Sequence, residues 1–250
     1  EEGLSPKTLR NYHMALHKCL QQAVKEHLLV YNPCDAVTLP SGEKPEIVVF
    51  TNDQQRALVQ ASYRHRYGVF IRLDLCTGLR MGELLALKWE DIDFTKKTVK
   101  IQRSMEYRHS VGEWRSGEPK SKSGYRTIPL TDEAIRILIA QKEKNKNIKE
   151  IQEEWSEFIF LSRKGEPVKN SAYDTALFKI CDKAEINRFS MHVLRHTFAT
   201  RCIEGGMMPK TLQKILGHSN IGITMNLYVH ITEEEKQKEI DKVSCVLNVG

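Results

Sequence analysis

The chain of 250 residues is long enough for one large domain and a smaller one, and 40% hydrophobic residues provide for a buried core. It contains no apolar run long enough to span a membrane and no signal peptide, and its six cysteines form no CxxC pair, so we expect a cytoplasmic protein with free thiols. The formal net charge is +6, and its distribution along the chain indicates where a polyanion could bind.

The first predicted element is a helix over residues 4–29. Ser5 is a good N-cap, Pro6 fits the first helical position, and leucines recur at helical spacing. The stretch YNPCDAVTLPSGEKPE, residues 31–46, contains three prolines and a glycine and is predicted to be a linker. We therefore expect two domains, residues 1–45 and 46–250. Because the chain starts without Met and enters a helix almost at once, we expect a piece of a longer protein.

The larger domain is predicted to be mainly α-helical with a small antiparallel β-sheet. TNDQ is a capping box that opens a helix at Thr51, and further helices are predicted over residues 67–78 and 79–93. TVKIQRSMEY and YRTIPL are β-rich and flank a polar, glycine-containing stretch, which predicts a hairpin. Thr131 caps a long helix and EFIFLS is a short strand. Four more helices are predicted, over residues 171–185, 190–204, 209–216 and 220–228.

Basic residues are concentrated between Lys96 and Arg126. This window holds nine Lys and Arg but only three Glu, so its net charge of +6 equals that of the whole chain. A concentrated basic patch indicates a binding site for a polyanion. An ordinary solvated hairpin would also explain the same charges.

The stretch MHVLRHTFATRC places His192, Arg195 and His196 within about one and a half turns of a predicted helix. His192 and His196 have the i, i+4 spacing of a zinc site. However, Val193 stands where the hydrolytic zinc motif needs Glu, and no third ligand stands out, so we expect no metal. His192 and Arg195 share one helical face, which fits an anion because arginine donates a rigid fork of hydrogen bonds to phosphate oxygens. A helix surface with a salt bridge would also explain this spacing.

Other segments supply compatible groups. TGLRMGELLALKWEDID holds Arg80 shortly after a glycine at a predicted helix start, where backbone amides also favour anions. KSKSGYRTIPL holds Lys122 in the basic window, and LGHSNIGITMNLYVH holds His218 and Tyr228. Two arginines, two histidines, a lysine and a tyrosine are together the groups that metal-free phosphoryl transfer requires.

At these residues the sequence resembles the tyrosine recombinase, or phage integrase, family, and within it the integrases of conjugative transposons and of temperate phages of Gram-positive bacteria. TGLRMGELLALKWEDID, HVLRHTFAT and LGHSNIGITMNLYVH match the family's boxes in order and spacing. The resemblance implies an integrase-type catalytic domain over residues 46–250. It implies that residues 1–45 are the C-terminal part of a helical core-binding domain that clamps DNA, together with the linker.

The function that the resemblance implies is site-specific DNA recombination, the integration or excision of a mobile element by a DNA strand transferase that uses no metal, ATP or other cofactor. Tyr228 resembles the nucleophile, which would form a 3′-phosphotyrosyl link and free a 5′-hydroxyl. Arg80 and Arg195 resemble the clamp on the non-bridging phosphate oxygens. Lys122 resembles the general acid that protonates the leaving oxygen, and His192 resembles the proton acceptor near the tyrosine.

Two further roles follow from the resemblance, and two alternatives stay open. His218 resembles a further donor to the phosphate, and Glu83 resembles a supporting carboxylate that orients the site. Lys120 lies two residues from Lys122, on the same side of an extended strand, so either lysine could be the general acid. Without the other motifs, Tyr228 would be interpreted as a buried helix-end tyrosine.

Contacts with double-stranded DNA are predicted in two regions, the helix over residues 4–29 and the basic window. The predicted DNA-binding residues are Lys7, Arg10, Lys18, Arg103, Lys120 and Arg126. The resemblance implies a homotetramer on paired attachment sites, with a C-terminal helix after Thr232 that docks on a neighbouring protomer, and it admits an excisionase as a partner. It also implies a location on the bacterial nucleoid, and no membrane.

Three other functions fit parts of the sequence. A type IB topoisomerase would use the same chemistry to nick and close DNA without paired sites. A DNA-binding module would use TLQKILGHSNIGITMNLY as a helix-turn-helix and would not need Tyr228. A metal-dependent phosphodiesterase would be inactivated by a chelator.

Overall fold

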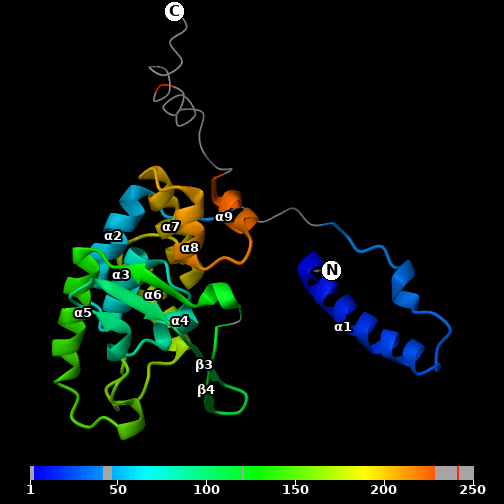
Figure 1. Cartoon of the computed structure of the whole chain (residues 1–250), viewed down its shortest axis with the longest axis horizontal. Coiled ribbons are helices and arrows are strands. Elements are labelled where there is room, and N and C mark those ends of the chain that lie inside the picture. Colours follow the sequence, from blue (N-terminus) through cyan, green and yellow to red (C-terminus); the bar gives the residue numbers. More distant parts are fainter. Residues whose placement is uncertain (1–2, 42–46, 120, 229–240, 242–250) are drawn as a thin grey trace, which may run out of the picture. The chain divides into compact units, whose positions relative to one another are not determined.

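The computed structural model describes residues 3–41, 47–119, 121–228 and 241, and for Tyr228 it describes the backbone only. The chain divides into two compact units, Glu1–Glu46 and Ile47–Gly250 (Figure 1). The division falls at the end of residues 31–46, the stretch that is predicted to be a linker. No helix in the described part of the chain is long and apolar enough to cross a membrane.

The first unit contains the helix α1 (Pro6–Lys25) and a short 3-10 helix (Pro33–Ala36) that folds back on it. The side chain of Ser5 accepts a hydrogen bond from the backbone of Thr8, which caps α1 as expected. The amide of Asn32 donates to the carbonyl of His17 at 3.0 Å, and His17 lies 2.7 Å from the carboxylate of Asp35. No residue of α1 is buried.

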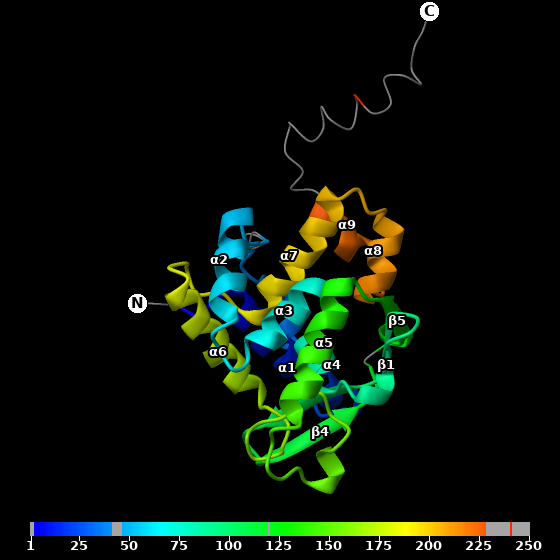
Figure 2. The ribbon, with the colours of Figure 1, turned by 90° about the vertical axis from the view of Figure 1, so that its left-hand side faces the viewer.

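The second unit is built mainly from helices, which confirms the expected fold class (Figure 2). The helices of this unit are α2 (Asn52–Ser62), α3 (Gly68–Thr77), α4 (Met81–Leu85), α5 (Asp132–Asn145), α6 (Asn170–Lys183), α7 (Met191–Glu204), α8 (Pro209–Leu216) and α9 (Ile221–Tyr228). Thr51 forms the predicted capping box with Gln54, and Thr131 caps α5. The helices after residue 170 agree with their predicted bounds within three residues.

Helix α3 lies at the centre of the second unit and packs against α2, α5, α6 and α7. Its apolar residues face neighbours on all sides, and Phe70, Ile71 and Leu73 are almost completely buried. The helix ends at Gly78, whose left-handed backbone (φ 60°) suits glycine. Because α3 is held on every side, the end that carries Gly78 is a firm base for the residues that follow.

The β-structure consists of two small antiparallel sheets. The three-stranded sheet has the order β1 (Ile92–Asp93), β2 (Thr98–Ile101), β5 (Arg126–Pro129), with Val99 opposite Ile92 and Ile128. The chain between β2 and β5 forms a separate hairpin of β3 (Ser104–Arg108) and β4 (Glu113–Gly117). The predicted pairing of the outer segments is therefore confirmed, but their polar connection is itself a second hairpin.

Two predicted elements are wrong, and for one reason. The helix predicted over residues 79–93 is only α4, followed by a short 3-10 helix (Trp89–Asp91) and β1. The strand predicted at EFIFLS is limited to isolated bridges. The backbone of Leu87 accepts from Ile159 at 3.0 Å, and Trp89 donates to Glu157 at 2.9 Å. This pairing of distant segments replaces the local helix.

Helices α7, α8 and α9 pack together around a second, smaller core. Its buried members are Ala199, Leu212, Leu216 and Leu227, with Phe198 and Cys202 packed against them. Helix α8 ends at Gly217, which has a left-handed backbone (φ 65°), as α3 does at Gly78. The C-terminal ends of α3 and α8 supply the acceptors of the site described next.

Candidate active site

Three guanidinium groups converge on successive backbone carbonyls at the C-terminal end of α8. The bonds run from Arg126 Nε to Ile215 at 2.6 Å, from Arg195 Nη2 to Leu216 at 2.6 Å and from Arg80 Nη2 to Gly217 at 3.1 Å. The last carbonyls of a helix have no partner within the helix and carry its negative partial charge. The end of α8 therefore gathers arginines from three parts of the sequence through acceptors that carry no full negative charge.

Glu83 links two of these arginines. Arg126 donates to both of its carboxylate oxygens, at 3.0 and 2.8 Å, and Arg80 donates to it from Nη1 at 2.9 Å and from the backbone at 3.0 Å. The side chain of Glu83 is 3% exposed. Burial alone would raise the pKa of Glu83, but the hydrogen bonds and charges of Arg126 and Arg80 lower it below its ordinary value. Glu83 is therefore ionised at neutral pH and bonded to the guanidinium groups of both arginines.

Arg195 is buried at the junction of α3, α7 and α8. Its Nη1 donates to the carbonyl of Gly78 at 2.7 Å. Burial, followed by the nearby charge of Arg80, lowers the pKa of Arg195 to about 9, which leaves it protonated at neutral pH. Asp74 is buried beneath this group. Its Oδ1 has no hydrogen-bond partner among the described residues, and burial raises the pKa of Asp74 well above its ordinary value.

His218 lies between Arg195 and α9. Its Nε2 is 3.0 Å from Nη2 of Arg195, and its Nδ1 is 2.9 Å from the hydroxyl of the fully buried Thr224. Arginine can only donate, so Nε2 accepts, and the ring proton on Nδ1 is donated to Thr224. Burial, then the charges of Arg195 and Arg80, lowers the pKa of His218 to about 4. The ring is therefore neutral at pH 7.

His192 lies in the first turn of α7 and is exposed to solvent. Asp174 on α6 and His196 on α7 are its electrostatic neighbours, since His192 contributes to the pKa shifts of both. Burial, then the charges of His192 and Arg195, lowers the pKa of His196. His192 is thus an accessible group on α7, one turn before Arg195, whereas His196 is half-buried.

Lys122 opens the short 3-10 helix (Lys122–Gly124) before β5 and is exposed. This segment touches the end of α8. A Cβ added at Gly217 would lie 2.8 Å from the carbonyl oxygen of Ser123. The absence of a side chain at Gly217 therefore allows the segment with Lys122 to pack against the turn that precedes His218. Lys120, the alternative general acid, lies outside the described residues.

Tyr228 is the last residue of α9. The helix is anchored by two buried residues, Thr224 through its bond to His218 and Leu227 in the second core. The backbone of Tyr228 therefore directly follows Leu227, a residue whose position is fixed by burial. Its side chain and the predicted capping box at Thr232 lie outside the described residues.

The predicted DNA contacts fall into two groups. Lys7, Arg10 and Lys18 are exposed on α1. Arg126 is not exposed: its side chain is 6% accessible, and all three of its nitrogens donate to protein oxygens. The prediction that Arg126 contacts DNA is corrected, because Glu83 and the end of α8 occupy it. Arg103 is also held, by Glu90 at 2.8 Å and Asp91 at 2.7 Å.

The sequence analysis missed three residues that shape this site. Thr224 holds the ring of His218, Asp74 places a buried carboxyl below Arg195, and Gly217 lets two segments touch. Only Gly217 had a visible signal, the turn before His218. Among the described residues no group of three His, Cys, Asp or Glu side chains could hold a metal ion.

Comparison with known families gives a match over residues 48–235 to the family described as the phage integrase family. A tyrosine recombinase XerC-like protein of Caldanaerobacter subterraneus subsp. tengcongensis is 30% identical over 263 residues, which cover 98% of this chain and 67% of that protein. The transposase of transposon Tn916 from Enterococcus faecalis is 30% identical over 258 residues, covering 98% of this chain and 63% of that protein. The chain thus spans about two thirds of the length of these relatives.

Solved structures give the same result. The integrase of transposon Tn1549, in complex with a circular intermediate DNA, superposes with a TM-score of 0.82 at 28% identity, over 97% of this chain and 81% of that one. The XerA recombinase shares the fold, with a TM-score of 0.61 at 21% identity over 96% of this chain and 84% of that one. The arginine cluster, the histidine on the turn after α8 and the tyrosine at the end of α9 lie within the matched residues. The chain belongs to the phage integrase family of tyrosine recombinases.

Proposed function

We propose that this protein cleaves and rejoins double-stranded DNA as the site-specific recombinase of a mobile element. The observation that carries the proposal is the convergence of Arg80, Arg195 and His218 at the end of α8, one short helix before Tyr228. Such a cluster of donors fits the phosphate of a DNA backbone, where negative charge increases in the transition state. The DNA-bound Tn1549 integrase supports DNA as the partner.

In the proposed reaction, the hydroxyl of Tyr228 attacks the scissile phosphorus, and the bond from phosphorus to the 5′-oxygen breaks. The products are a 3′-phosphotyrosyl link and a strand with a free 5′-hydroxyl, so the energy of the phosphodiester bond is conserved. His192, the exposed histidine of the cluster, accepts the proton of the tyrosine. Lys122 donates a proton to the leaving oxygen.

Arg80 and Arg195 bind the non-bridging oxygens in this scheme. Both already donate to backbone carbonyls, so they are held in place before DNA binds. Glu83 and Arg126 do not touch the phosphate, but they keep the guanidinium of Arg80 in position. This arrangement reduces the reorganisation that the reaction requires.

His218 has a double role in the proposal. While its Nε2 accepts from Arg195, as in this structure, His218 cannot donate to a phosphate from that atom. The negative charge of a bound phosphate would raise the pKa of His218 from its value of about 4 and favour protonation of Nε2. DNA would thus convert His218 from an acceptor of Arg195 into a donor to the phosphate.

The proposal extends to the assembly that would recombine DNA. We expect a homotetramer on paired attachment sites, with α1 clamping DNA through Lys7, Arg10 and Lys18. The segment over residues 232–250 would dock on a neighbouring protomer, and an excisionase would direct excision. The place of action would be the nucleoid in the bacterial cytoplasm. Deletion of residues 232–250 should abolish coordinated cleavage of paired sites, whereas unchanged coordination would refute the docking.

The central test is a covalent-trapping assay. The protein is incubated with a labelled duplex from the end of the element, nicked beside the cleavage position, in EDTA and then denatured in SDS. We expect a covalent protein–DNA band that Tyr228→Phe abolishes and the matched change Tyr63→Phe preserves, because Tyr63 is exposed and is not one of the residues of the candidate site.

Each alternative function gives a different result in this assay. A band that survives Tyr228→Phe would refute the nucleophile. Salt-sensitive binding without a band would favour a DNA-binding module, and loss of the band in EDTA would favour a metal-dependent enzyme. Relaxation of a supercoiled plasmid that lacks attachment sites would favour a topoisomerase.

A further inference from the structure

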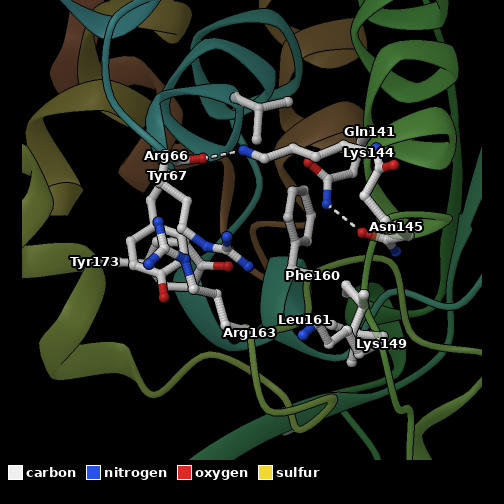
Figure 3. A pocket seen from close by; sticks show the side chains of 13 residues that line it. Arg66, Tyr67, Gln141, Lys144, Asn145, Lys149, Phe160, Leu161, Arg163 and Tyr173 are labelled. Atoms are coloured by element: carbon white, nitrogen blue, oxygen red, sulfur yellow. Dashed lines mark hydrogen bonds between the residues drawn. The ribbon is translucent and has the colours of Figure 1, made fainter.

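A cavity of about 300 Å³ lies at the end of α3 opposite Gly78, outside the arginine cluster (Figure 3). It is bounded by the N-terminal end of α3, the C-terminal end of α5, the segment around Phe160 and α6. Its volume lies at the lower end of the range for small-molecule sites, about 300–1,000 Å³. The ten residues of α3 extend for about 15 Å, so the cavity and the arginine cluster are separate.

The lining of this cavity carries an uncompensated positive charge. Four cations contribute to it, Arg66, Lys144, Lys149 and Arg163, and none of its thirteen lining residues is Asp or Glu. Lys144 donates to the backbone carbonyl of Arg66. Burial, then the charges of Arg66 and Arg72, lowers the pKa of Lys144, as expected where no carboxylate balances it. An anion in the cavity would relieve this repulsion.

Aromatic rings form another part of the lining. Tyr173 stacks on Phe70 with a centroid distance of 3.6 Å and meets Tyr67 edge-on at 5.4 Å. Figure 3 shows Arg66, Tyr67 and Tyr173 on one side of Phe160, with Gln141, Lys144 and Asn145 on the other. A planar ligand entering between these sides would therefore meet aromatic surface as well as positive charge.

Three buried polar atoms of the lining have no hydrogen-bond partner within the described residues. They are Nε of Arg66, Oε1 of Gln141 and the hydroxyl of Tyr173. The side chain of Gln141 is fixed, because its Nε2 donates to Asn145 at 2.7 Å and to the carbonyl of Ile159 at 3.2 Å. Buried polar groups are normally paired, so two free donors and a fixed free acceptor indicate a ligand with matching groups.

We propose that this cavity binds a mononucleotide, a small phosphate monoester that carries an amino-substituted aromatic base. The phosphate pairs with Arg163 and Lys149, which are exposed at the cavity and have no carboxylate partner in the described part of the chain. The base lies against Tyr67 and Phe160, and its amino group donates to Oε1 of Gln141. The site is independent of the proposed DNA cleavage, since it shares no residue with the arginine cluster.

Calorimetric titration of the whole chain with adenosine 5′-monophosphate tests the proposal. We expect saturable binding to one site, with adenosine, ribose 5-phosphate and inorganic phosphate each at least about tenfold weaker, because each lacks one recognised part. Arg163→Gln and Lys149→Gln should each weaken binding about tenfold. The matched change Arg64→Gln removes an exposed arginine that does not line the cavity and should have no effect.

Two results would overturn the proposal. Arg163→Gln and Lys149→Gln could both bind the nucleotide as the parent chain does, which would place binding elsewhere, for instance at the arginine cluster. Inorganic phosphate or adenosine could also bind as tightly as the nucleotide, which would show that the cavity does not recognise both parts. The covalent-trapping assay with Arg163→Gln keeps the two proposals distinguishable, because its DNA product should be unchanged.

Discussion

The protonation state of His218 is the residue-scale feature that solution measurements test most directly. Its folded-state pKa of about 4 lies below the ordinary value of 6.5, so between these two pH values the unfolded chain binds the extra proton. Stability should therefore fall as the pH decreases from 6.5 toward 4. We expect His218→Asn to show a smaller loss of unfolding free energy between pH 7 and pH 4.5 than the parent chain in urea titrations.

A comparison with another shifted histidine isolates this effect. Burial lowers the pKa of His65 as well, which precedes α3 at the end opposite the arginine cluster. His65→Asn should leave the contribution of His218 in place. An identical pH dependence in His218→Asn and the parent chain would contradict the neutral, accepting ring described above.

The ion pair of Arg126 and Glu83 predicts a large loss of stability on substitution. Arg126→Met leaves a buried carboxylate without its main partner, which costs about 3–5 kcal/mol in such pairs. The loss should diminish as the pH falls below the ordinary value of 4.5, because burial without Arg126 favours protonation of Glu83 in the variant, and protonation removes the unpaired charge. Denaturant titration at pH 7 and pH 4 measures both effects.

A second arginine serves as the matched control. Arg188 holds Asp182 with the same two-bond geometry, at 2.8 Å each, but both side chains are about half exposed. Arg188→Met should cost far less unfolding free energy than Arg126→Met, because water screens exposed pairs. Equal costs at the two positions would show that burial does not decide the strength of the Glu83 pair.

Sequence motifs predicted the residues of the candidate site but not all of their partners. Arg80, His192, Arg195 and His218 were chosen by type and spacing. The structure brings Arg80, Arg195 and His218 together at the end of α8, and His192 lies on α7 as a neighbour of His196. Arg126 was predicted to contact DNA because it belongs to the basic window, which was defined by counting charged residues along the sequence. Its partner Glu83 lies 43 residues earlier, a distance across which local pattern carries no information.

At the scale of elements, helix caps and periodic leucines were sufficient to predict a helix wherever no distant segment bonds to its backbone. They failed at residues 86–93, where apolar spacing favoured a longer α4. There the backbone of Leu87 and Trp89 bonds to Ile159 and Glu157 instead. Most of β3 lies within the segment TVKIQRSMEY that was predicted to be β-rich, but β4 was missed because its residues are mostly polar and exposed. Both cases depend on partners that a single segment does not reveal.

The turn after α8 gives a prediction for Gly217→Ala. A left-handed alanine costs about 1–2 kcal/mol. Its Cβ would in addition lie 2.8 Å from the carbonyl oxygen of Ser123 and 2.9 Å from Nη1 of Arg126, which adds about 1–3 kcal/mol for overpacking. We expect a loss of at least about 2 kcal/mol in unfolding free energy and reduced DNA cleavage, since the segment with Lys122 must move.

Gly206 is the matched control for this change. It also has a left-handed backbone, with φ 79°, but nothing in the described structure lies within 4 Å of a Cβ added there. Gly206→Ala should lose only the unfolding free energy that a left-handed alanine costs, and its DNA cleavage should be normal. If both variants lose the same stability and activity, the contact between Gly217 and Ser123 does not position Lys122.

At the scale of the whole molecule, the basic window offers DNA fewer free charges than its sequence indicates. Five of its cations lie within ion-pair distance of carboxylates: Lys96, Lys97, Arg103, Arg115 and Arg126. Of the remaining described cations, Lys100 and Arg108 are exposed and not assigned to catalysis. These two residues are therefore the preferred sites for a test of backbone binding.

Binding to DNA at several salt concentrations measures their contribution. Lys100→Gln and Arg108→Gln should each reduce the slope of log affinity against log salt by about 1, because each removes one phosphate contact. Lys97→Gln should change the slope less, since its Nζ pairs with Asp132 at 2.5 Å. Unchanged slopes for all three variants would show that DNA follows another surface.

The attachment of the arginines to the backbone of α8 has a consequence for how this protein can evolve. The acceptors are carbonyls of residues 215–217, which every amino acid retains, so the side chains of this segment are free to vary as far as packing allows. The number of residues is not free. Inserting or deleting one residue would turn each carbonyl by about 100° and shift it by about 1.5 Å, which would separate all three guanidinium groups from their acceptors at once. Variation among descendants of this sequence should therefore preserve the length of α8 and its turn more strictly than their composition.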